Sequence, residues 1–325
     1  MTLRTGGLTI KTENTNHFRV NQSPDLQQIL NNPILDIAAR FWEDERYNAF
    51  RICYQSMRSV DDLIDNRKAD FRQISPVEKQ QLTAVVHDWL TAMKEATPRD
   101  LFQKQLAETR AKFQIPLWPW QNLSKSMIYD MSHEGFKDFK AFIRYSEGAA
   151  VSPGAIFMHL CGVVKEKGYY RPPHYHIGKA ARPLALFCYL VHIIRDFQKD
   201  QNDNLNYFAD NLVSENELNP QLLKEIAAGS KISLSFRNLM GQYYTFAEYY
   251  RRKARQMIDK ISVYLEPRYQ LSLEIIYSLY LQIFERIDVT NGRFTTAELC
   301  PLPEEVQNRI NLTISSFESG KEKTN

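Results

Sequence analysis

The chain has 325 residues, of which 43% are hydrophobic and 24% charged, and its formal net charge is +3. This apolar content allows a large buried core, and the small net charge implies neither nucleic acid nor an acidic substrate as a partner. The four cysteines are scattered without a Cys-x-x-Cys pair, a usage typical of buried thiols in a reducing compartment.

The chain begins with a polar segment. We expect residues 1–30 to form a loose arm ahead of a single domain over residues 31–325. No apolar segment of the signal-peptide kind opens the chain, and the longest apolar stretch, 183–194, is too short to span a bilayer. These features predict a soluble, cytoplasmic protein that can touch a membrane surface peripherally.

Helical periodicity dominates the rest of the chain. Apolar residues recur every three or four positions over 42–66, which predicts a long helix there. Further helical patterns cover 76–96, 99–113, 120–133, 139–164, 176–199, 219–228, 232–261, 268–289 and 302–318. Residues 165–175, with one glycine and two prolines, predict a loop. No run alternates with period two, so we expect an all-α single domain.

The first helix carries an acidic motif. Tyr54, Arg58, Asp61 and Asp65 are spaced four, three and four residues apart, so they form one polar stripe on the helix. Asp62 lies one position off this stripe and should point elsewhere.

A second stripe occurs on the helix expected over 176–199. Tyr189, His192, Asp196 and Asp200 are spaced three, four and four, and Arg195 precedes the first aspartate. A single stripe of this kind is as often a solvated helix face as part of a functional site. Two stripes within apolar sequence indicate facing walls of a cavity, because burying unpaired carboxylates on an apolar helix costs free energy. Carboxylate oxygens bind Mg²⁺, Mg²⁺ binds phosphate, and arginine adds forked donors to the same oxygens. The matching substrate is a diphosphate.

Small residues fill the segment between the two motifs. Tyr145-Ser146-Glu147-Gly148-Ala149-Ala150-Val151-Ser152-Pro153-Gly154 reads as one helix that Pro153 kinks. The pattern is compatible with close helix packing and equally with a thin wall against which a long apolar chain lies.

Taken in order, these motifs resemble the squalene and phytoene synthase family, whose members join two prenyl diphosphates head to head. The resemblance covers roughly residues 41–210 and includes Tyr54 before Arg58 and Asp130 in Met127-Ile128-Tyr129-Asp130-Met131. It implies an all-α isoprenoid synthase bundle around a central cavity, with Mg²⁺ bridging Asp61, Asp65, Asp196 and Asp200 to diphosphate.

The resemblance also implies roles for other residues. Arg58 and Arg195 would contact diphosphate, and Tyr54 and Tyr145 would lie at the cavity mouth near the reacting carbons. Ala150 and Gly154 would line the tunnel, and Tyr249 is our choice for the late-helix tyrosine that lines the family's pocket. NADPH is not supported by the sequence, which has no dinucleotide glycine fingerprint, yet squalene synthases bind it without one.

Three departures from the family pattern concern phosphate contacts. The stretch Asn32–Ile37 lacks the family's Ser or Arg, and Tyr189 and His192 replace a Gln and an Asn. The segment after the second motif, 202–207, lacks the usual arginine. His192 is open to two interpretations, a neutral hydrogen-bonding group beside Asp196 or a base acting on a carbocation.

We therefore carry three functions forward. The first is Mg²⁺-dependent head-to-head condensation of farnesyl or geranylgeranyl diphosphate to a C30 or C40 isoprenoid, released with peripheral membrane contact. The second is a single-substrate terpene synthase on the same fold, favoured by the missing phosphate contacts. The third is a non-catalytic binding or assembly protein, which four retained aspartates disfavour. The sequence sets neither chain length nor oligomeric state.

Overall fold

The computed structural model describes residues 24–30, 32–69, 74–94, 100–133 and 135–322, and the fold is all-α. The helices up to residue 162 are α1 (Leu26–Ile29), α2 (Ile34–Ala39), α3 (Asp44–Ala69), α4 (Pro76–Lys94), α5 (Leu101–Phe113), α6 (Trp118–Asp130), α7 (Phe139–Ala149) and α8 (Val151–Gly162). The later helices are α9 (Ile177–Arg195), α10 (Phe197–Asn202), α11 (Asp210–Glu215), α12 (Pro220–Ala227), α13 (Leu234–Ser262), α14 (Pro267–Phe284), α15 (Thr296–Leu299) and α16 (Pro303–Glu322).

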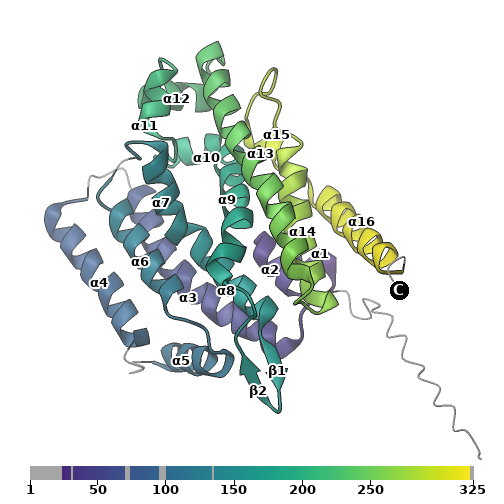
Figure 1. Ribbon diagram of the computed structural model, residues 1–325. Helices are drawn as coiled ribbons and strands as arrows, with labels where there is room; N and C mark the ends of the chain where they lie inside the picture. The colour runs from purple at the N-terminus through teal and green to yellow at the C-terminus, as the bar shows by residue number, and fades with distance from the viewer. Residues whose placement is uncertain (1–23, 31, 70–73, 95–99, 134, 323–325) are drawn as a thin grey trace, which may run out of the picture.

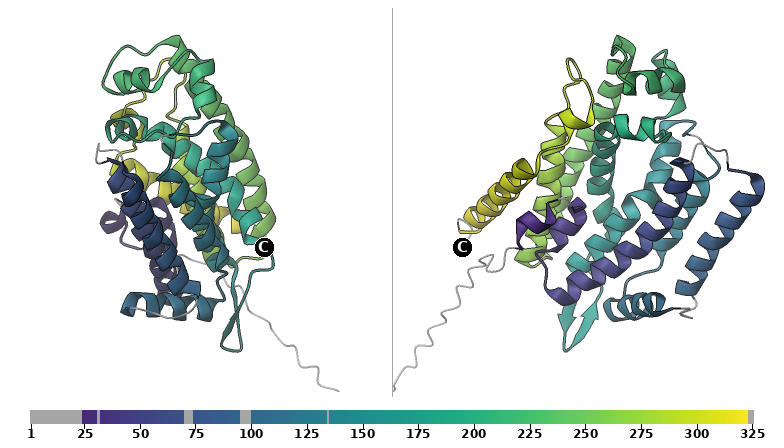
Figure 2. Two further views of the ribbon diagram at one scale, coloured as in Figure 1. Left: turned by 90° about the vertical axis from the view of Figure 1, so that its left-hand side faces the viewer. Right: turned by 180° about the vertical axis from the view of Figure 1, so that it is seen from behind.

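Helix α9 is the central element of the bundle. It packs against α8 on one side and α13 on the other, with α14 also in contact (Figure 1). By length and composition alone its 19 residues could cross a membrane, but 56% of its apolar window is buried inside the fold. Such burial is what the core helix of a bundle shows. Seen from behind in Figure 2, α3 crosses the molecule diagonally, where it contacts α5, α6 and α8.

Two helices expected to be continuous are broken beside the motifs. The segment 139–164 divides into α7 and α8 at Ala150, which has φ −114°. Pro153 does not cause this break, because it occupies the first turn of α8, where backbone N–H groups have no helical partner. The segment 176–199 breaks at Asp196, and Asp200, one residue beyond the expected helix, lies inside α10.

A β-hairpin occupies part of the expected loop. Strands β1 (Val164–Glu166) and β2 (Tyr169–Arg171) pair antiparallel, with Val164 opposite Arg171. The turn between them has positive φ at Lys167 and Gly168, 50° and 88°, a backbone twist that suits two-residue hairpins. Three residues per strand are too few for an alternating pattern to be visible in the sequence.

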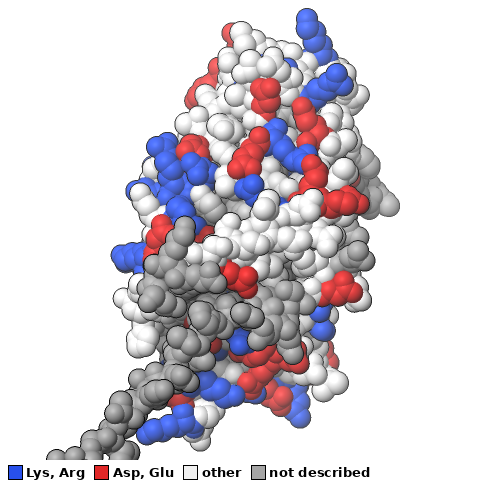
Figure 3. Space-filling model, turned by 90° about the vertical axis from the view of Figure 1, so that its right-hand side faces the viewer, with Lys and Arg blue, Asp and Glu red and all other residues white. Residues whose placement is uncertain are grey.

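The expected N-terminal arm lies mostly outside the described residues, which begin at residue 24. Its last part is not loose, because Leu26 and Ile29 of α1 are buried in the core. On the face that carries α16, acidic and basic side chains are both spread over the surface (Figure 3).

Candidate active site

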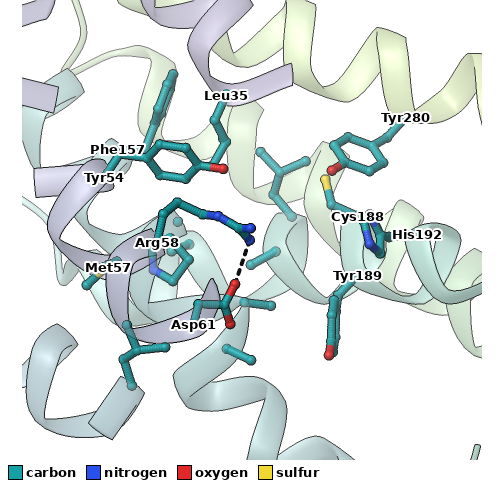
Figure 4. Close-up of a pocket in the computed structure, with 18 of the residues that line it drawn as sticks. Leu35, Tyr54, Met57, Arg58, Asp61, Phe157, Cys188, Tyr189, His192 and Tyr280 are labelled. Atoms are coloured by element: carbon teal, nitrogen blue, oxygen red, sulfur yellow. Dashed lines mark hydrogen bonds and ion pairs between the residues drawn. The ribbon is translucent and has the colours of Figure 1, made fainter. Parts of the chain in front are cut away.

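A cavity of about 360 Å³ lies among α3, α7, α8, α9, α10 and α14. Its lining contains both acidic pairs and ten of the twelve residues singled out as candidate site residues from the sequence: Tyr54, Arg58, Asp61, Asp65, Tyr145, Ala150, Gly154, His192, Asp196 and Asp200. Figure 4 shows Tyr54, Arg58 and Asp61 from α3 on one side, with Cys188, Tyr189 and His192 from α9 facing them. Side chains far apart in sequence therefore meet in one site.

Charges at the acidic end are unevenly compensated. Arg58 donates to Asp61 Oδ2 at 2.5 Å and also binds Asp62, which does not line the cavity. Burial raises the pKa of Asp61 to about 6, with Arg58 opposing and Asp62 and Asp130 adding to the rise. Burial, together with repulsion from Asp61 and Asp130, raises the pKa of Asp65 to about 7.

The opposite pair behaves in two ways. Burial, together with repulsion from Asp196 and Asp65, raises the pKa of Asp200 to about 8. Burial is also the largest single influence on Asp196, but the hydrogen bonds and charge of Arg195, together with His192 and Lys199, outweigh it and leave that pKa below its usual value. Asp65 and Asp200 line the same cavity, and the charge of Asp65 adds to the rise at Asp200.

Arg195 is turned toward Asp196 and does not line the cavity. Its Nε and Nη2 each lie 2.7 Å from an oxygen of Asp196, and Nη2 also lies 2.9 Å from Nδ1 of His192. Because arginine can only donate, Nδ1 of His192 accepts, and Nε2 carries the proton that points to Asp196 Oδ2 at 3.1 Å. Burial and the charge of Arg195 lower the pKa of His192 to about 4, so the ring is neutral near pH 7.

The carboxylates fit a divalent cation that shares oxygen ligands with a phosphate. Asp65 Oδ1 is buried without a hydrogen-bond partner, and three of the four carboxyl groups have a raised pKa because burial and the neighbouring carboxylates outweigh the nearby cations. Hard oxygen donors in this state suit Mg²⁺. Among the described residues, no group of three or more acidic, histidine or cysteine side chains is close enough to hold an ion without further ligands. The remaining ligands would come from a bound phosphate and from water.

Tyrosines line the cavity next to the carboxylates. Tyr145 is 4% exposed, and Tyr189 stacks on Phe142 at a centroid distance of 5.6 Å. Tyr54 stacks on Phe50 at 5.3 Å. Burial raises the pKa of all three hydroxyls, so they are neutral groups, and their aromatic rings form part of the cavity lining.

The small residues serve two different purposes. A Cβ on Gly148 would lie 2.1 Å from Ser126 Oγ, so this glycine lets α7 pack closely on α6. Ala150 and Gly154 line the cavity, and a Cβ on Gly154 would approach Ala185 Cβ at 3.3 Å. Close packing and a thin wall, which the sequence left open, therefore apply at different positions.

Two of the expected site residues lie outside the cavity lining. Tyr249 on α13 is 54% exposed and outside the cavity lining, where Tyr280 of α14 lies instead. Both helices carry several tyrosines at helical spacing, so periodicity does not choose between them. Arg195, expected at the diphosphate, is occupied by Asp196 and His192.

Lys199 and Tyr207 are further polar residues of the lining that were not predicted as site residues. Lys199 had a visible signal, since it directly precedes Asp200 within the second motif.

The chain is similar to a family of known proteins. The family model described as squalene/phytoene synthase matches residues 36–307. The chain is 22% identical over 247 residues to a chloroplastic phytoene synthase of Narcissus pseudonarcissus and 21% identical over 248 residues to phytoene synthase 1 of Zea mays. These matches cover 76% of this chain and 54% and 56% of the relatives, so the chain spans about half their length.

Solved structures show the same fold. A dehydrosqualene synthase in complex with ligand superposes with a TM-score of 0.61 at 16% identity, covering 88% of this chain and 95% of that one. A squalene synthase from Alicyclobacillus acidocaldarius gives 0.52 at 12% identity, covering 74% and 93%.

Proposed function

The chain belongs to the squalene/phytoene synthase family, and we propose that it condenses two prenyl diphosphates head to head into a C30 or C40 isoprenoid. The observation that carries the proposal is the cavity itself, in which Asp61, Asp65, Asp196 and Asp200 gather at one end of an otherwise mainly apolar lining. A ligand with an anionic head and a long hydrocarbon tail matches both ends.

Asp61, Asp65, Asp196 and Asp200 would hold Mg²⁺ between the protein and the diphosphate. When bound, the ion neutralises negative charge that develops on the departing diphosphate. Arg58 and Lys199 both line this end and supply N–H donors to phosphate oxygens. The direct contribution of the chain is thus to bind and orient the head group.

The apolar part of the cavity would protect and position the reacting carbons. Departure of diphosphate leaves an allylic cation, which water would quench. The lining of Leu123, Phe157, Met158, Leu184 and Ile276 excludes water, and the rings of Tyr145, Tyr189 and Tyr280 place π electrons beside the cation. Holding the second double bond close to that cation favours carbon–carbon bond formation over quenching.

A single-substrate terpene synthase is the second candidate, and two observations favour it. The cavity of about 360 Å³ lies at the small end of the range for pockets that enclose one ligand. Arg195 is engaged by Asp196 and His192, which removes one expected phosphate contact. Either reaction suits a soluble or membrane-peripheral protein, and a need for NADPH would be seen only in the first.

The proposal is tested by diphosphate release from farnesyl and geranylgeranyl diphosphate with Mg²⁺. Asp61→Asn and Asp200→Asn should each lower the rate by about a hundredfold or more, because each removes charge that holds the leaving group's cation. Asp259→Asn, an equal charge change on the surface of α13, should leave the rate unchanged. Equal rates in Mg²⁺ and in EDTA would contradict the proposal.

A further inference from the structure

A second, larger cleft adjoins the acidic end of the cavity. Its volume is about 980 Å³, and its walls come from the ends of α3, α4 and α6 and from α11 and α12. Four lysines from different segments converge on it, namely Lys68, Lys79, Lys137 and Lys224. No part of the reaction described above uses this cleft.

The charge of the cleft is opposite in sign to that of the cavity. Lys68 Nζ lies 2.7 Å from Asp130 Oδ1, and Asp130 is only 4% exposed, so this pair contributes little net charge. The remaining charged groups of the lining are Lys79, Lys137, Lys224 and one acid, Asp210. By contrast, the cavity lining has four aspartates against Arg58 and Lys199.

Two of these lysines have no ion-pair partner among the described residues. Within the residues that the structure describes, Lys79 and Lys137 make no ion pair. Lys224 donates to Asn204 Oδ1 at 2.5 Å, which ties α12 to the segment that follows α10. Polar groups able to donate hydrogen bonds, among them Asn204, Asn206 and Ser132, complete the lining.

A thin wall separates the cleft from the cavity. Leu205 lines both spaces, and its backbone N–H donates to the carbonyl of Asp200 at 2.7 Å. Gln201 Nε2 donates to the carbonyl of Leu205 at 3.2 Å and also lines the cleft. On the other side, Lys68 lies one helical turn beyond Asp65 on α3. An anion leaving the carboxylates thus has a cationic space next to it.

We propose that the cleft is a second diphosphate site, which binds inorganic diphosphate without a metal ion as that product leaves the cavity. The identity of the anion rests on the proposed function, whereas the existence of an anion site rests on the lysines. Lysine ammonium groups bind phosphate as point charges, and the partly enclosed cleft lessens the screening of that attraction by salt. Four carboxylates, in contrast, repel an anion unless a cation joins it.

The test is calorimetric titration of the full chain with sodium diphosphate in EDTA at low ionic strength. The wild type should bind, and Lys79→Gln/Lys137→Gln should weaken binding by about tenfold or more, because two charged contacts are lost. The matched control is Lys125→Gln/Lys140→Gln, which removes the same charge from exposed lysines of α6 and α7 outside the cleft. It should change the affinity less than about twofold.

Three outcomes would overturn the site: no binding of diphosphate in EDTA, equal weakening in the control variant, and binding that ignores the Lys79/Lys137 change. Thermal unfolding of each variant, expected to match the wild type, shows that the fold is intact. Turnover of prenyl diphosphates with Mg²⁺ is measured separately, so loss of the proposed function and loss of this site are distinguishable.

A second titration identifies the source of the diphosphate. Farnesyl thiodiphosphate, an unreactive analogue, carries the same head group with an apolar tail. If the cleft serves the released product, the Lys79/Lys137 change weakens inorganic diphosphate and leaves the analogue nearly unaffected. Equal weakening of both ligands would assign the cleft to the head group of a substrate and overturn its role in product release.

Discussion

At the scale of single residues, the four carboxylates of the cavity are held in different electrostatic states. Asp196 accepts hydrogen bonds from Nε and Nη2 of Arg195, whereas Asp65 has a buried oxygen without a partner. The pKa of Asp200 rises to about 8, above that of Asp65 at about 7. The negative charges of Asp65 and Asp200 are therefore the least compensated by positive groups, and a cation would be bound most strongly beside these two residues.

His192 provides a prediction at this scale. Its neutral ring accepts from Arg195 and donates to Asp196, a pattern that an asparagine amide reproduces in part. His192→Asn should retain most of the turnover and leave the product unchanged, as judged by initial rates and mass spectrometry of the extract.

If His192 instead acted as a base on a carbocation, the same substitution would alter the product mixture. Wild-type activity would then also fall below about pH 6.5, the range in which an ordinary imidazole gains a proton. The lowered pKa of about 4 predicts no such fall from this residue.

The positions of most site residues could be predicted from spacing. Residues four, three and four apart on a helix must share a face, and both stripes do line the cavity. Arg195 could not be placed this way, because the chain leaves helical geometry at Asp196, with φ −93° and ψ 6°. Tyr280 could not be distinguished from Tyr249 either, since the choice depends on how α13 and α14 pack.

At the scale of secondary-structure elements, the break between α7 and α8 separates packing from cavity lining. Gly148→Ala places a methyl group against Ser126 and the carbonyl of Asn122, so it should lower the free energy of unfolding by about 1–3 kcal/mol. Ala150 lines the cavity, so Ala150→Phe adds a bulky ring to its wall. This change should instead lower turnover of the longer prenyl diphosphate by about tenfold, with stability nearly retained.

Chemical denaturation and initial rates on both substrates measure the two effects. The interpretation fails if Ala150→Phe unfolds the protein as readily as Gly148→Ala while leaving chain-length preference unchanged. The two roles could not be assigned from the sequence, since a glycine and an alanine two positions apart carry no signal of which neighbour each one faces.

The hairpin shows the limit of periodicity at this scale. It is joined to α3 and α5 through Glu45, whose Oε2 accepts from Tyr170 Oη at 2.7 Å and Lys165 Nζ at 3.1 Å, while Lys112 Nζ lies 2.6 Å from Oε1. These contacts depend on tertiary structure, and the sequence of two three-residue strands does not predict them.

At the scale of the whole molecule, the stability of the fold in acid depends on the contacts by which Glu45 joins the hairpin to α3 and α5. Hydrogen bonds from Lys112 and Tyr170 lower the pKa of Glu45 from 4.5 to about 2. A lowered pKa in the folded state contributes stability above pH 4.5, and this contribution is lost as the pH falls from 4.5 toward 2.

Glu45→Gln should therefore lower Tm at pH 7, and its difference from the wild type should shrink as the pH is lowered through this window. Glu166→Gln is the control and should show a smaller difference, because Glu166 lies on the hairpin itself and, among the described residues, pairs only with exposed Arg171. A Glu45→Gln difference that stays constant from pH 7 to pH 3 would show that the linkage is absent.

The all-α architecture followed from the helical periodicity of the sequence, because long amphipathic helices dominate the chain. The volume of the cavity could not be predicted from this periodicity, since it depends on how α3, α8, α9 and α14 pack together. That volume bears on whether the protein takes one prenyl chain or two.

The most direct test of head-to-head condensation is the mass of the product. Purified protein is incubated with farnesyl or geranylgeranyl diphosphate and Mg²⁺, with and without NADPH, and the organic extract is analysed by mass spectrometry. Condensation predicts a C30 or C40 isoprenoid, absent when EDTA replaces Mg²⁺. An extract that contains only C15 or C20 hydrocarbons or alcohols, at substantial diphosphate release, would contradict it.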